Sequence, residues 1–60
     1  MNETLHEALN LNSEERAILA ELLESERTEL LVEIRHTDHS VFRDELRHRL
    51  SLVEGMLQRC

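Results

Sequence analysis

Glu33, His36 and His39 are the residues of this 60-residue chain whose types and spacing come closest to a metal site. Glu33 and His36 form a Glu-x-x-His, and residues three apart on a helix lie on the same face. In helical bundles that hold two metal ions, this spacing brings a carboxylate and an imidazole to one metal. One alternative for this segment is therefore a zinc or iron site made by Glu33, His36 and His39.

A metal-free interpretation of the same residues is open too, because buried bundle sites need further carboxylates from facing helices. The second helix offers only Asp44 and Glu45 near that level. His36 would then interact with the last carbonyl groups of its helix, and His39 would decorate a turn. No nucleophile accompanies these groups, so the sequence predicts no enzyme and no resident cofactor.

Two helical segments must position these residues, and each carries one apolar seam. Apolar residues recur at steps of three and four from Leu19 to Ile34, with Glu26 as the polar exception, and again from Phe42 to Leu57. This is the period of a helix face. A reversal near residue 38 would bring the seams together as an antiparallel hairpin. The predicted hairpin core is Leu19, Leu23, Leu30, Ile34, Phe42, Leu46, Leu50, Val53 and Leu57.

The predicted fold class is all-α, with helices over about 13–35 and 38–58. No segment alternates apolar and polar residues as a strand would. Ser13 is the expected N-cap of the first helix, and Thr37 or Asp38 that of the second. Residues 1–12 form either a leader or a short helix over Asn2 to Asn10, and residues 13–60 form the hairpin.

Further apolar residues lie outside both seams, and a hairpin with one contact line cannot cover them. Left exposed, they would form a larger patch than monomers usually carry. The sequence therefore predicts a homo-oligomer, with a dimer that forms an antiparallel four-helix bundle favoured over a monomer. Glu26 is expected to lean to the rim or to meet an Arg of a partner chain. The predicted oligomer interface is Ile18, Leu22, Leu31, Val41, Leu52 and Met56.

Charge is unevenly placed along the chain. The net charge is −6, and residues 1–30 hold eight Glu against two Arg, whereas residues 31–60 hold five acids and five Arg. Without a basic stripe, nucleic-acid binding by the chain alone is not expected, because phosphate contacts dominate such affinity. Neither a membrane span nor a signal peptide is indicated, so the expected compartment is the cytoplasm.

The segment from Leu11 to Ser25 resembles the opening of small bacterial addiction-module antidote proteins. It reads Leu-Asn-Ser-Glu-Glu-Arg-Ala-Ile-Leu-Ala-Glu-Leu-Leu-Glu-Ser and shares their Leu-x-x-x-Glu-Arg and Leu-Ala-Glu-x-Leu elements. The resemblance implies that the chain neutralises a partner toxin. The part from Glu29 to Leu57 looks like other small bacterial helical proteins and implies no function. The residues themselves predict a non-enzymatic helical oligomerisation and protein-interaction module.

Overall fold

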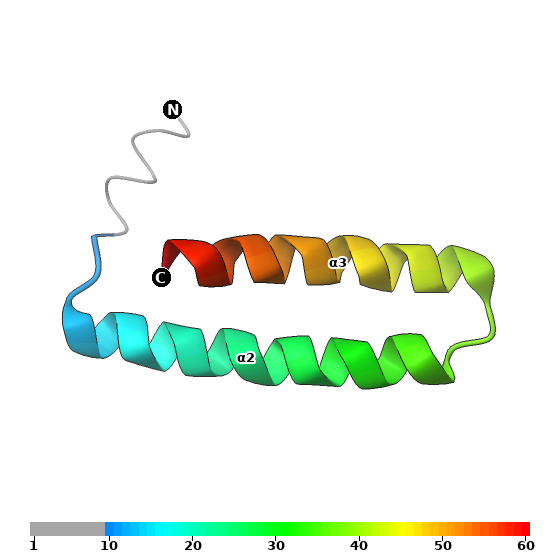
Figure 1. The fold of residues 1–60 in the computed structure, drawn as a ribbon, viewed down its shortest axis with the longest axis horizontal. Helices are drawn as coiled ribbons and strands as arrows, with labels where there is room; N and C mark the ends of the chain where they lie inside the picture. The colour runs from blue at the N-terminus through cyan, green and yellow to red at the C-terminus, as the bar shows by residue number, and fades with distance from the viewer. Residues whose placement is uncertain (1–9) are drawn as a thin grey trace, which may run out of the picture.

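A computed structural model describes residues 10–60, which form two antiparallel helices (Figure 1). Helix α2 spans Ser13–His36 and helix α3 spans Ser40–Arg59, and residues 37–39 connect them. The predicted all-α hairpin is confirmed, and each predicted helix end lies within two residues of the observed one. Of residues 1–12, predicted as a leader or a short helix, residues 1–9 lie outside the described residues.

Helix α2 begins with a capping box one residue earlier than predicted. The Asn12 side chain accepts a hydrogen bond from the Glu15 backbone N–H at 2.8 Å, and the Glu15 carboxylate accepts one from the Asn12 N–H at 3.0 Å. Asn12, not Ser13, is therefore the N-cap. The shift moves Glu15 to the third helical position, where its carboxylate satisfies a backbone donor that the helix leaves free.

The connection between the helices uses Thr37 differently from the prediction. Thr37 caps the end of α2, and its hydroxyl donates to the Glu33 backbone carbonyl at 2.6 Å. The carbonyl of Thr37 in turn accepts from the Arg43 guanidinium, with Nη2 at 2.8 Å and Nε at 3.3 Å. The N-cap of α3 is His39, which makes no side-chain capping bond, so neither Thr37 nor Asp38 has that role.

The core is a single line of side chains between the helices. Leu23, Leu30, Leu46 and Val53 are buried, and Leu30 is only 2% exposed. The remaining predicted seam residues, with one exception, are partly buried against them: Leu19, Ile34, Leu50 and Leu57.

Phe42 is the exception, because its side chain is 49% exposed and lies outside this cluster. The prediction that it belongs to the hairpin core is wrong. Phe42 stands in the first turn of α3, where the chain has only just left the connection. The neighbouring Arg43 is half-buried there and reaches back to the Thr37 carbonyl, so a cation rather than an aromatic ring closes this end.

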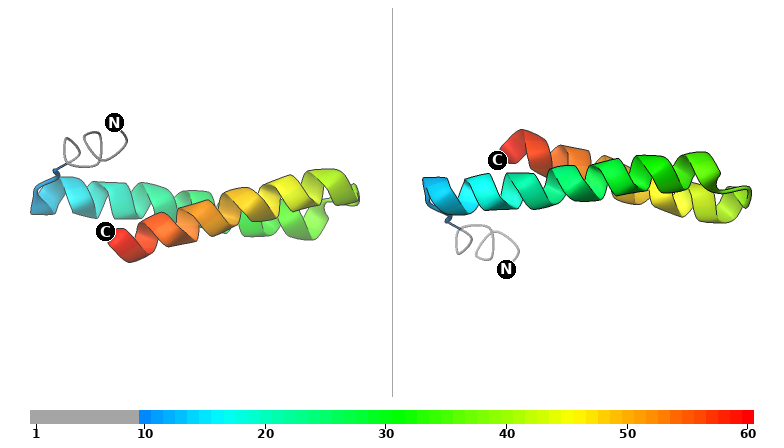
Figure 2. Two further views of the ribbon diagram at one scale, coloured as in Figure 1. Left: turned by 90° about the horizontal axis from the view of Figure 1, so that it is seen from above. Right: turned by 90° about the horizontal axis from the view of Figure 1, so that it is seen from below.

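Within the described chain, α2 and α3 pack on each other alone. The two views of Figure 2 show them crossing near their middle, so the ends of the hairpin diverge slightly. Neither helix combines the length and the apolar character that a membrane crossing requires.

Candidate interaction surface

The predicted metal ligands do not converge on one point. His36 is the last residue of α2, and His39 is the last residue of the connection and the N-cap of α3. Among residues 10–60, no three His, Cys, Asp or Glu side chains are placed together as a metal site would need. His36 instead adds a basic group to the last turn of α2, which suits the negative end of the helix dipole.

An ion pair joins the two helices where the seam is interrupted by Glu26. The Glu26 carboxylate accepts from Arg49 Nε at 2.5 Å. This hydrogen bond, with the attraction of the same carboxylate, raises the pKa of the Arg49 guanidinium above its ordinary value. Glu26 thus meets an Arg of its own chain. The sequence had left only the rim or a partner chain open.

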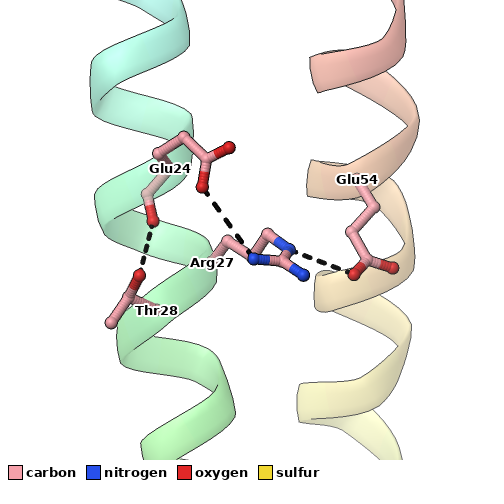
Figure 3. Close-up of polar contacts among 4 residues, drawn as sticks. All are labelled: Glu24, Arg27, Thr28 and Glu54. Carbon is pink, nitrogen blue, oxygen red and sulfur yellow. Dashed lines mark hydrogen bonds and ion pairs between the residues drawn. The ribbon is translucent and has the colours of Figure 1, made fainter.

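A second ion pair, which the sequence did not predict, joins the helices through Arg27. Arg27 Nε donates to the Glu54 carboxylate across the hairpin at 3.2 Å (Figure 3). Glu24, one turn earlier on α2, lies 3.9 Å from the same guanidinium. Arg27 is therefore held between carboxylates of both helices. In the sequence, only the opposite charges of Arg27 and Glu54 point to this pair. Matching them to each other requires knowing the register of the two helices in the hairpin.

These two ion pairs mark opposite sides of the contact line. Leu23 lies on that line, and Glu26 and Arg27 follow it by three and four residues, so their side chains flank it on its two sides. Each reaches α3 at a different residue, Arg49 for one and Glu54 for the other. The hairpin consequently has two distinct faces, each identified by its own ion pair.

The Glu26–Arg49 pair lies on the face with the most exposed apolar side chains. Leu22 precedes Glu26 by one helical turn and is 62% exposed, and Ile18 precedes it by two turns. On α3, Leu52 and Met56 follow Arg49 by about one and two turns and are exposed as well. We call this side the apolar face, and its apolar residues are Ile18, Leu22, Val41, Phe42, Leu52 and Met56.

Four of these side chains gather at one end. In an antiparallel hairpin the start of α2 lies beside the end of α3 (Figure 1). Ile18 and Leu22 are therefore level with Leu52 and Met56, and we call these four residues the open-end patch. Toward the connection, the same face becomes acidic through three glutamates that stand on the rows of Glu26 and Arg49, namely Glu29, Glu33 and Glu45.

The Arg27–Glu54 pair lies on the opposite side, which we call the arginine face. Arg35 follows Arg27 by about two turns, and Arg43 and Arg47 precede Glu54 on matching rows. Leu31 follows Arg27 by one turn, so it belongs here and is only 37% exposed. The six residues predicted as one oligomer interface are thus divided, with Leu31 apart from the other five.

Comparison with known proteins gives no relative to reason from, since no family model, curated protein or solved structure matches the chain. The resemblance of residues 11–25 to antidote proteins therefore stays a prediction. Among the described features, the apolar face is the one that a hairpin alone leaves uncovered.

Proposed function

We propose that this chain is a non-enzymatic helical interaction module that self-associates through its apolar face. In this proposal two hairpins stack as an antiparallel four-helix bundle, with the open-end patch of one copy covered by the other. The arginine face stays in water and is free for a different protein partner.

One observation carries the proposal: the open-end patch exposes four apolar side chains on a hairpin whose described residues bury only four. Its four side chains are all large and apolar. Burying a side chain of this kind contributes roughly 1.5–3 kcal/mol, so leaving four of them in water forgoes much stabilisation. The buried core has the same number of residues, Leu23, Leu30, Leu46 and Val53. A chain of this length is marginal on its own core, and association is a common remedy.

Sedimentation of the pure protein over a range of micromolar concentrations tests the proposal. We expect a dimer mass that is unchanged by a chelator. Leu22→Glu places a charge in the open-end patch and should shift the mass toward the monomer. Leu31→Glu makes the same change on the arginine face and should leave the dimer intact. A wild-type monomer with full helicity at these concentrations would refute self-association.

The charge of the apolar face favours a second candidate, that of an antidote for a basic partner toxin. Glutamates 29, 33 and 45 lie beside exposed apolar residues, a combination that fits an amphipathic helix with a basic rim. Co-expression with the product of each neighbouring gene tests this candidate. A stable complex that restores growth supports it, and the absence of any toxic neighbour counts against it.

A further inference from the structure

We propose that the two hairpins of the dimer dock with their connections at the same end, related by a two-fold axis parallel to the helices. This arrangement rests on the proposed self-association and specifies how the two copies are oriented. It places α2 of one copy over α3 of the partner, and it keeps every level of one hairpin beside the same level of the other.

The apolar residues favour this arrangement because all four members of the open-end patch lie at one end. With both connections at the same end, Ile18 and Leu22 of one copy meet Leu52 and Met56 of its partner. Since an isologous interface repeats every contact, the eight side chains form one continuous apolar cluster. Leu22 would then be covered on the side where it is now exposed.

The opposite arrangement, with connections at the two ends, joins unlike surfaces. The open-end patch would then lie over the connection half of the partner's face, where Glu29, Glu33 and Glu45 stand beside the exposed side chains of Val41 and Phe42. Carboxylates pressed against leucine and isoleucine lose water without gaining a partner, which is unfavourable. The distribution of residues along the face thus distinguishes the two ways of stacking.

The charged residues in the middle of the apolar face also favour connections at the same end. Arg49 already binds Glu26 of its own chain and is exposed on its outer side. When equal levels meet, this guanidinium also approaches the partner's Glu26. Each of the two arginines would then lie between two carboxylates at the centre of the bundle. Charged groups arranged in this way fix register and orientation more than they add affinity.

The acidic half is where this dimer is weakest. Glu29 and Glu45 stand at nearly the same level, so the two copies bring four carboxylates together beyond the central arginines. Like charges at close range oppose association, and salt screens them. The dimer is therefore anchored at its open end, and salt should reduce the repulsion within its acidic half.

Cross-linking through cysteine tests the arrangement. Cys60 is the single cysteine of the chain and is exposed at the open end, so it serves as a natural probe. In the proposed dimer the two Cys60 residues face each other across a bundle whose diagonal is roughly 11–14 Å, given helix spacings of about 8–10 Å. In the opposite arrangement they are about 30 Å apart, the length of α3.

A matched variant, Cys60→Ser with Ser40→Cys, moves the probe to the connection at the start of α3. With a bismaleimide that spans about 15 Å, slightly more than the diagonal of the bundle, each protein alone should give a covalent dimer. The two proteins, one of them carrying a mass tag, are then mixed and left to exchange subunits before the reagent is added. In the proposed dimer, Cys60 of one subunit and the cysteine at position 40 of the other lie at opposite ends, so few mixed products should form. The Leu22→Glu variant, which keeps Cys60 but should not dimerise, measures how much cross-linking arises from random collision.

The outcomes separate the two proposals. Cross-links within each cysteine type, without products between types, support connections at the same end. Products between the two types alone would overturn this arrangement while leaving self-association in place. Masses that grow beyond the dimer with concentration would overturn it as well, because they indicate the apolar face of one copy on the arginine face of the next. A monomer by sedimentation would refute the proposed function itself.

Discussion

The two faces of the hairpin are built by the same two helices, yet they differ in both polarity and charge. The apolar face carries the open-end patch and the acidic row beside it, with Arg49 at its centre. The arginine face carries four arginines, Arg27, Arg35, Arg43 and Arg47, and the apolar residue Leu31, which is only marginally exposed. Val32, which is 46% exposed, lies on the outer side of α2, away from both faces.

The difference between them arises from a step of one residue. Glu26 and Arg27 are adjacent in sequence, but they flank the contact line on opposite sides and select different partners on α3. A helix turns far enough in one residue to separate an acidic side chain from a basic one. Two short helices can therefore present one surface suited to association and another suited to water.

The largest expected effect compares the contact line with the position next to it. Leu30→Ala should lower the free energy of unfolding by about 2–5 kcal/mol, because Leu30 is the most buried side chain and its removal leaves a cavity. Leu31→Ala removes the same atoms from a partly exposed site and should cost much less. Urea unfolding of both variants measures the difference. Equal losses would contradict the assignment of Leu30 to the core.

Gly55→Ala should stabilise the hairpin without altering either face. A methyl group added at Gly55 meets nothing within 4 Å, and alanine is favoured over glycine inside a helix by about 0.5–1 kcal/mol. The melting temperature should rise and the sedimentation mass should not change. A fall in the melting temperature would show a contact on that side of α3. The same added stability makes Gly55→Ala the background in which to measure Leu22→Glu, whose dimer should be lost.

The two ion pairs should respond differently to neutralisation. Arg27→Gln breaks a pair that lies within one hairpin, is partly exposed, and is worth about 0–1 kcal/mol, so association should be unaffected. Arg49→Gln removes a cation from the centre of the apolar face and should weaken the dimer. Sedimentation of the two variants side by side measures this contrast. Equal dissociation constants would place Arg49 outside the interface.

The smallest expected effect concerns the acidic half of the apolar face. Glu45→Gln should tighten the dimer by about twofold, because a close pair of like charges opposes association by only a few tenths of a kcal/mol. Glu54→Gln, on the arginine face, should leave the dissociation constant unchanged. Measurements at low and high salt provide the check, since the benefit of Glu45→Gln should shrink as salt rises.

The hairpin itself could be predicted from the sequence because period and chain reversal determine it together. Leu23, Leu30, Leu46 and Val53 recur at helical spacing, and a reversal near Asp38 makes them meet. The division of the exposed residues could not be obtained in the same way. Ile18 and Leu31 both lie outside the seam, and only the pairing of α2 with α3 shows on which side each of them falls.

Two local features also escaped the sequence analysis, for different reasons. Asn12 and Ser13 both have side chains that cap helices, and the backbone has to choose between them. Here the extended conformation of Asn12 and the reach of Glu15 select Asn12. Phe42 has the spacing of a core residue, but it stands beside the connection, where Arg43 closes the hairpin. Spacing alone gives no information on how far a contact line extends.

The hydrogen bonds from Arg43 to the Thr37 carbonyl also bear on the order in which the chain loosens. They fasten the connected end of the hairpin, whereas at the other end Leu19 and Leu57 are only partly buried. Amide protons near Ile18 and Met56 should therefore exchange with deuterium sooner than those near Leu30 and Leu46. A partner bound at the open end would slow deuterium exchange most at that end, where the isolated hairpin protects its amide protons least.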